Sequence, residues 1–199
     1  MIRLARRSWC TDLMSESALP PRPSHLKRRT EEMLRVDHAG EYGAVQIYRG
    51  QRAVFEKLPH KARITGLLRE MEQGEEKHLE TFDRMLSERS VRPTLLAPLW
   101  NAAGFALGAG TALLGEKAAM ACTSAVESVI EGHYQDQVDE LDGQNEDELR
   151  DTFAQFREEE LEHHDTAIAE GAEEALGYRF LRSVITAGCQ AAIKVSEKI

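Results

Sequence analysis

The sequence EELEHHD, residues 159–165, decides the fold, because six of its seven residues are titratable although a pattern typical of a buried helix face leads into it. Apolar residues precede it at helical spacing, at Leu149, Phe153 and Phe156. This spacing predicts an apolar face, and the same face continues through Glu160 and His163. A buried carboxylate or imidazole costs several kcal/mol unless a partner or a metal satisfies it. The stretch therefore predicts a helix with functional groups on its core side.

The same pattern occurs once more, earlier in the chain. A predicted helix follows the apolar positions Ile64, Leu67, Leu68, Met71, Leu79, Phe82 and Leu86. Glu75 and His78 occupy positions on this apolar face, with hydrophobic residues before and after them. Glu and His three residues apart project side by side from one helical turn, so both side chains can reach one cation.

Two further predicted helices each carry a glutamate followed seven residues later by a tyrosine. These pairs are Glu41 with Tyr48 and Glu127 with Tyr134. Each precedes one of the Glu-x-x-His pairs, at a distance of 34 residues from Glu41 to Glu75 and 33 residues from Glu127 to Glu160. The repetition predicts a duplicated two-helix unit with pseudo-twofold symmetry. The tyrosines are candidates for hydrogen bonds to metal ligands, or are ordinary core residues.

Together these positions match the ligand set of a ferritin-like di-iron or di-manganese bundle, in which two helices give one Glu each and two give Glu-x-x-His. The predicted metal ligands are Glu41, Glu75, His78, Glu127, Glu160 and His163.

Alternatives stay open at three of these positions. Within EELEHHD, Glu159 or Glu162 could take the place of Glu160, and His164 that of His163. Glu131, one turn after Glu127, could compete with it if it faces inward. Asp37 is a candidate for orienting a ligand imidazole. His38 and His60, like Glu131, are interpreted as solvated or boundary residues.

The rest of the chain predicts an all-α protein, because apolar residues recur at helical spacing and β-branched runs are absent. Four long helices form the bundle, and two further helical segments have a different character. The first bundle helix follows Met33 to Leu58 and stops at Pro59, the third ends at Asp142-Gly143, and the fourth opens at a capping box beginning with Asn145.

Length, charge and cysteine content limit the possible functions of the chain. The chain has 199 residues, of which 42% are hydrophobic and 30% charged, which suits one domain with a substantial core. A net charge of -9 argues against nucleic acid as a partner. The three cysteines show no C-x-x-C spacing, so neither a disulfide framework nor a thiolate zinc site is indicated.

The chain divides into a short N-terminal segment and one large domain. Residues 1–24 combine three early arginines with a proline-rich stretch, which predicts a flexible segment that is either a mitochondrial targeting sequence or a basic tail. Residues 25–199 are predicted to form a single ferritin-like di-iron domain.

The two additional helical segments suggest a membrane. Residues 94–115 contain no charged residue, but Pro98, Asn101 and several glycines lower their hydrophobicity. We therefore expect a helix that lies in or against the membrane interface, the alternatives being a spanning helix or a helix buried in a larger core. Residues 178–197 are amphipathic and could cap the bundle or rest on lipid.

Five stretches carry a resemblance to a known family. They are RVDHAGEYGAVQIYRGQ (35–51), EEKHLETF (75–82), AVESVIEGHY (125–134), FREEELEHHD (156–165) and AGCQAAIKVSEKI (187–199). From about residue 27 to its end, the chain resembles the 5-demethoxyubiquinone hydroxylases of ubiquinone biosynthesis, the Coq7 or Clk-1 family.

The resemblance implies a di-iron monooxygenase that hydroxylates the benzoquinol ring of 5-demethoxyubiquinol, with two Fe ions per chain and O2 and NADH as co-substrates. It implies the same six metal ligands, with Glu75 and Glu160 bridging, and a role in electron transfer for His133 and Tyr134. It also implies a peripheral inner-membrane protein, on the cytoplasmic face of a bacterial membrane or the matrix side of the mitochondrial one.

The expected partners are a membrane-borne polyprenyl quinone, a ubiquinone-biosynthesis complex or a lipid-extracting protein, and a second copy of this chain. Two rival functions remain. A ferritin-like ferroxidase or iron-storage protein would not need the uncharged run at residues 94–115, and a non-catalytic quinone-binding scaffold would bind no iron.

Overall fold

The computed structural model describes residues 24–198, and within them it shows six α-helices and two short 3-10 turns without a strand. The helices are α1 (His25–Phe55), α2 (Ala62–Arg89), α3 (Ala97–Leu113), α4 (Glu116–Leu141), α5 (Asp147–Ala169) and α6 (Tyr178–Ser196). The predicted all-α class is confirmed. The N-terminal segment, with the targeting sequence or tail predicted there, lies outside the described residues except for Ser24.

The helix boundaries follow local capping chemistry. Ser24 begins α1 well before Met33, because its hydroxyl accepts a hydrogen bond from the backbone N–H of Lys27 at 3.1 Å. Ser90, in the left-handed conformation with φ of 57°, ends α2. The predicted cap of the fourth bundle helix is wrong by one residue. Asn145 has a positive φ of 59°, so it belongs to the preceding turn, and Glu146 is the residue that flanks α5 without a side-chain cap.

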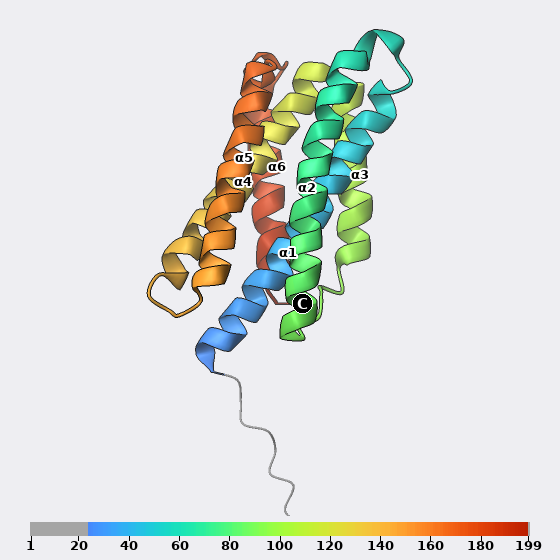
Figure 1. Ribbon diagram of the computed structural model, residues 1–199. Coiled ribbons are helices and arrows are strands. Elements are labelled where there is room, and N and C mark those ends of the chain that lie inside the picture. The colour runs from blue at the N-terminus through green and yellow to red at the C-terminus, as the bar shows by residue number, and fades with distance from the viewer. Residues whose placement is uncertain (1–23, 199) are drawn as a thin grey trace, which may run out of the picture.

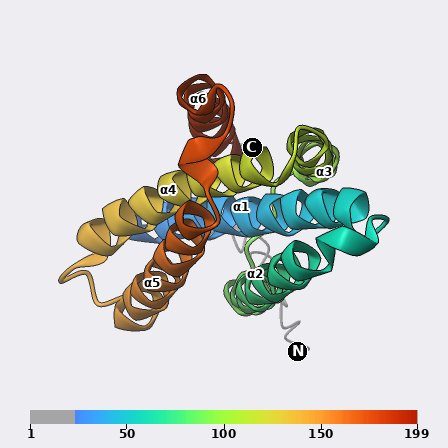
Figure 2. The same ribbon diagram turned by 90° about the horizontal axis from the view of Figure 1, so that it is seen from above.

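The helices form three layers when the molecule is seen along the bundle (Figure 2). Helices α1 and α4 lie in the middle, α2 and α5 lie on one side of them, and α3 and α6 lie on the other. The four helices of the first two layers are the predicted bundle (Figure 1). Both faces of the middle layer are therefore covered by other helices.

Two apolar clusters divide the bundle core along its length. One contains Phe55, Leu68 and Met120, and the other contains Phe82 and Phe153. On all four bundle helices the predicted metal ligands occur in the sequence between residues of one cluster and residues of the other. Apolar packing thus encloses the ligands from both ends and keeps their surroundings at low dielectric.

Helix α3 packs against α1 at backbone distance, which requires glycine. A Cβ atom built on Gly108 would lie 2.0 Å from the carbonyl oxygen of Ile47, and one on Gly50 would lie 2.3 Å from that of Phe105. Backbone atoms cannot give way as a flexible side chain can. The segment expected to lie on the membrane is therefore partly a buried helix, although Leu99, Phe105 and Leu113 stay exposed.

None of the helices within residues 24–198 combines the length and the apolarity needed to cross a bilayer.

A glycine pair on α3 tests this packing. We expect Gly108→Ala to lower the free energy of unfolding by about 1–3 kcal/mol, because the new methyl group pushes α3 away from α1. Gly110→Ala, where a Cβ meets no atom within 4 Å, should instead raise it by about 0.5–1 kcal/mol through helix propensity. Urea unfolding followed by circular dichroism measures both. Equal effects of the two changes would contradict the close packing.

Candidate metal centre

The structure brings the six predicted ligands together in two overlapping groups. One group is Glu41, Glu75, His78 and Glu160, and the other is Glu75, Glu127, Glu160 and His163. In each group the potential ligand atoms all lie within 4.8 Å of one another. Glu75 and Glu160 belong to both groups, which is the arrangement expected of carboxylates shared by two metal ions.

Each imidazole turns its Nδ1 atom toward the shared carboxylates. The Nδ1 atom of His78 lies 3.1 Å from Glu160 Oε1 and 3.3 Å from Glu41 Oε2. The Nδ1 atom of His163 lies 2.8 Å from Glu75 Oε1. Except for His163, which is half-buried, the ligand residues are almost completely buried.

The donor set fits a pair of metal ions, because its buried atoms lack other partners. Eight of these atoms are buried without a hydrogen bond: Glu41 Oε2, both carboxylate oxygens of Glu75 and of Glu160, Glu127 Oε2, and Nδ1 of His78 and of His163. Orphaned polar atoms are rare in protein interiors. Carboxylate oxygens with imidazole nitrogens suit iron or manganese, and their negative charge can balance two divalent cations.

Two tyrosines form hydrogen bonds between the two halves of the duplicated pattern. Tyr48 on α1 donates a hydrogen bond to Glu127 Oε1 on α4 at 2.6 Å, and Tyr134 on α4 donates one to Glu41 Oε1 on α1. Each tyrosine thus holds one oxygen of a ligand carboxylate and leaves the other free. The predicted hydrogen bonds from these tyrosines to the candidate ligands are present, and the pairing is reciprocal as pseudo-twofold symmetry requires.

Burial and crowding by carboxylates shift the pKa values at the centre upward. Burial raises the pKa of Glu127 well above its usual value, and the charges of Glu160 and Glu75 add to this effect. Burial alone lowers the pKa of His163, but the nearby carboxylates of Glu160 and Glu75 outweigh it and raise the pKa to about 11. The metal-free centre therefore holds protons at neutral pH where a metal-bound centre would hold cations.

These pKa shifts predict that the metal-free protein loses stability in alkali. A group whose pKa is higher in the folded than in the unfolded state stabilises the fold below its unfolded pKa. For His163 that stabilisation is lost as the pH rises from 6.5 to about 11. We expect the free energy of unfolding to fall by on the order of 1–3 kcal/mol between pH 6.5 and 9.

The measurement is urea unfolding of chelator-treated protein across this pH range. Metal-loaded protein is the control and should show a smaller slope, because a bound cation replaces the protons. Stability that rises with pH in the metal-free protein would contradict the assignment.

The alternatives left open by the sequence lie outside both groups. Glu131 is half-buried and belongs to neither group, and His164 contacts Asp165 at 3.1 Å instead of the centre. Glu162 is exposed. Glu159 is not in either group, but its Oε2 atom lies 2.6 Å from His78 Nε2. The sequence suggested Glu159 only as a substitute for Glu160, so this contact was missed.

Two other expectations need correction. Asp37 does not orient a ligand imidazole. Its Oδ1 atom lies 3.3 Å from Nε2 of His133, and the Gln137 amide also donates to it at 3.0 Å. His38 is not solvated, since its ring is buried and its Nε2 atom lies 2.9 Å from Asp83 Oδ1. His60 is exposed, as expected.

His133 and Tyr134 point in different directions from α4. Tyr134 reaches Glu41 at the centre, whereas His133 lines an open, polar hollow between α4 and α6 that also contains Arg182 and Lys194. Burial alone lowers the pKa of His133, but its hydrogen bond to Asp37 raises it above the usual value. These adjacent residues thus connect this polar hollow with the edge of the candidate metal centre.

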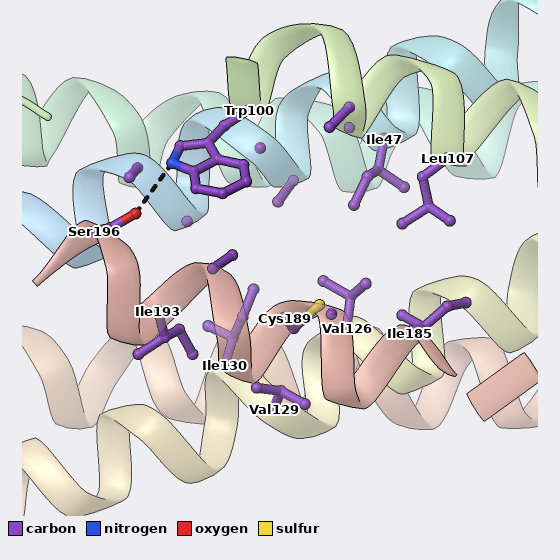
Figure 3. A pocket seen from close by; sticks show the side chains of 18 of the residues that line it. Ile47, Trp100, Leu107, Val126, Val129, Ile130, Ile185, Cys189, Ile193 and Ser196 are labelled. Atoms are coloured by element: carbon purple, nitrogen blue, oxygen red, sulfur yellow. Dashed lines mark hydrogen bonds between the residues drawn. The ribbon is translucent and has the colours of Figure 1, made fainter. Parts of the chain in front are cut away.

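An apolar cavity of about 420 Å³ lies on the opposite face of the middle layer from the ligands. Helices α1, α3, α4 and α6 line it, and Figure 3 shows Ile47, Leu107, Val126 and Ile185 around it. Gly40 and Val126, which also line it, are the chain neighbours of Glu41 and Glu127. The cavity therefore ends beside the helix turns that carry two of the ligands.

Comparisons with known proteins agree on one family. Residues 28–196 match the family described as ubiquinone biosynthesis protein COQ7. The chain is 53% identical over 185 residues to a 3-demethoxyubiquinol 3-hydroxylase of Rhodospirillum rubrum, covering 93% of this chain and 85% of that protein. It is 49% identical to the mitochondrial NADPH-dependent 3-demethoxyubiquinone 3-hydroxylase of Rattus norvegicus, covering 84% and 77%. It is 42% identical to the mitochondrial 5-demethoxyubiquinone hydroxylase of Saccharomyces cerevisiae, covering 85% and 78%.

Proposed function

Because the chain belongs to the COQ7 family of ubiquinone biosynthesis proteins, we propose that it is a di-iron monooxygenase. Its substrate would be 5-demethoxyubiquinol, a 2-polyprenyl-3-methyl-6-methoxy-1,4-benzoquinol, which it hydroxylates on the ring. Relatives named as demethoxyubiquinol or demethoxyubiquinone hydroxylases support the reaction. The observation that carries the proposal is a buried cluster of four carboxylates and two imidazoles with eight unpartnered atoms, next to an apolar cavity.

The six ligands would hold two iron ions, with Glu75 and Glu160 shared and Glu41 and Glu127 at the two ends. Bound iron would supply a site for O2 and the electrons to reduce it. One oxygen atom of O2 enters the ring in place of hydrogen, and the other leaves as water with two electrons from a reductant and two protons. The tyrosine hydrogen bonds orient the terminal carboxylates, and the apolar clusters exclude water from the reacting groups.

We place the quinol in the apolar cavity. Its lining is almost entirely hydrophobic, which suits a methylated ring with a polyprenyl tail. Small residues at Gly40, Gly43 and Ala44 bring the cavity close to the turn of α1 that carries Glu41. The ring would therefore approach the metal centre between α1 and α4, and the tail would extend between α3 and α6.

The reductant would be a reduced nicotinamide nucleotide. NADH is the expected donor, and the name of the rat relative gives NADPH for that protein. Arg182 and Lys194 in the polar hollow would attract its phosphates, and His133 with Tyr134 would lie between the nucleotide and Glu41. We expect His133→Gln to slow turnover with the nucleotide but to leave a single turnover after chemical reduction unchanged. Equal loss in both assays would remove this role.

Helices α3 and α6 lie on one side of the molecule and would face the membrane (Figure 2). Leu99, Phe105 and Phe180 are exposed there, and the exposed Arg179 beside Phe180 on α6 would favour anionic headgroups. A peripheral membrane site would deliver the polyprenyl quinol directly to the cavity, with or without a lipid-extracting partner or a second copy of the chain. Flotation with anionic vesicles tests this, and Phe180→Ser should weaken the binding.

The decisive experiment is an activity assay in which the mass of the product and the iron content of the protein are both measured. Protein purified in detergent without O2 is analysed for iron, then mixed with air, NADH or NADPH, and a short-tailed demethoxyquinone. A product heavier by one oxygen atom, formed only by protein with two irons per chain, is the expected result. Oxidation of iron without an oxygenated quinone would favour the ferroxidase or iron-storage function instead. Protein that binds no iron would point to the non-catalytic scaffold.

A further inference from the structure

The two halves of the centre differ at one pair of equivalent positions. In the duplicated pattern, Gly74 precedes Glu75 and Glu159 precedes Glu160. Each of these residues lies beside the histidine of the other half. Glu159 Oε2 is 2.6 Å from His78 Nε2, and a Cβ atom on Gly74 would lie 3.2 Å from His163 Nε2. One histidine thus has a carboxylate partner where the other faces a residue without a side chain.

The carboxylate of Glu159 fixes the ring of His78. Its Oε2 atom accepts the Nε2–H of His78, so Nδ1, which faces the ligand carboxylates, is the nitrogen left to bind a metal. Gln155, one turn earlier on α5, donates to Glu159 Oε1 at 2.8 Å and holds the carboxylate in place. Phe156 stacks on the other side of the imidazole, with ring centroids 4.0 Å apart. His78 is therefore restrained both in tautomer and in orientation.

His163 has no such restraint among residues 24–198. Its Nδ1 atom faces Glu75, but neither a hydrogen bond nor an ion pair holds its Nε2 atom there. The ring lies over Gly74 on α2, and Tyr48 meets it only edge to face, with centroids 6.2 Å apart. The pseudo-twofold symmetry of the ligands is thus broken by the residues that surround them.

We propose that Glu159 is a positioning residue that makes the two metal positions unequal, so that the position containing His78 binds metal more tightly than the one containing His163. A carboxylate that accepts the remote N–H of a ligand imidazole pins the ring and makes it a better donor. The metal position that contains His163 then loses its metal first. Its histidine is the ligand whose ring is free to move. This inference rests on the proposed metal function.

The test is a titration of metal-free protein with Co²⁺ in the absence of O2, followed by its visible absorption. Wild-type protein should bind two ions in separate steps. Glu159→Ala should weaken the tighter step by about 10–100-fold and leave the other step unchanged. In Glu159→Gln the amide oxygen can still accept the N–H, so the affinity of the tighter step should lie between that of the wild type and that of Glu159→Ala. Glu162→Gln, at an exposed acid on the same helix, is the matched control and should change neither step.

A complementary change addresses the other position. Gly74→Ala pushes against the ring of His163 and should weaken only the looser step, whereas Gly66→Ala, on the same helix with no atom within 4 Å, should not affect it. Two equal steps in wild-type protein, or equal loss of both steps in Glu159→Ala, would overturn the inference and leave the metal function standing. Protein that binds no Co²⁺ or Fe²⁺ at all would overturn the proposed function and this inference with it.

Discussion

Glu160→Gln should abolish hydroxylation while the protein stays folded. The side chain of Glu160 is fully buried, and its two oxygens lie 3.1 Å from His78 Nδ1 and 3.5 Å from His163 Nδ1. It is one of two residues common to both ligand groups, so its replacement affects both metal positions. We expect iron to fall well below two ions per chain and turnover to fall at least about 100-fold, since even residues that only orient a ligand can contribute that much.

The stability of the same variant separates a functional role from a structural one. Four carboxylates crowd the metal-free centre, and an amide of the same shape removes one buried charge. The metal-free Glu160→Gln protein should therefore be as stable as the wild type or more stable, as measured by urea unfolding. Glu162→Gln is the control for both assays. Full activity with two irons per chain in Glu160→Gln would remove the residue from the centre.

Gly188→Leu should block the substrate while leaving the metal centre intact. Gly188 lies on α6 at the wall of the apolar cavity, and a Cβ atom there meets no atom within 4 Å. A leucine side chain would project into space that the quinol is proposed to occupy. We expect kcat/KM for a long-tailed demethoxyquinol to fall about 10-fold or more, which corresponds to roughly 1.4 kcal/mol of lost binding.

Iron content and tail length provide the controls for this prediction. Iron should stay at the wild-type value, because the cavity and the ligands lie on opposite faces of the middle layer. A substrate with a short tail should be affected less if the tail lies along α6. Gly66→Leu, at an open position on α2, should leave the kinetics unchanged. Unchanged kinetics in Gly188→Leu would place the substrate elsewhere.

The sequence could predict which residues meet in the candidate metal centre because each signal lies within one helix. Glu160 and His163 are three residues apart and interrupt an apolar face. The same periodicity therefore predicts the helix and shows that two titratable residues lie on its core side. The repetition at Glu75 and His78 reduces the chance of coincidence. Contacts within a turn depend on helix geometry alone, and helix geometry is the same in every protein.

The sequence analysis is wrong where contacts between helices determine the partner of a side chain. Asp37 is one turn from Glu41 and could have faced either ligand histidine, but the packing of α1 on α4 pairs it with His133. His38 looks like a surface residue until α2 places Asp83 beside it. For the uncharged run of α3 the sequence left both a membrane-interface helix and a buried helix open, and the close packing of its glycines on α1 shows that one side of it is buried.

The sequence by itself determined the all-α class, the four bundle helices and the six candidate metal ligands, because these follow from periodicity, capping residues and spacing along single helices. Only the tertiary structure decided how the halves meet. It pairs each tyrosine with the glutamate of the other half, sets Glu159 beside His78 but Gly74, which has no side chain, beside His163, and opens an apolar cavity behind α1 and α4. These features join residues far apart in the chain, so their geometry depends on how whole helices pack, which no local pattern encodes.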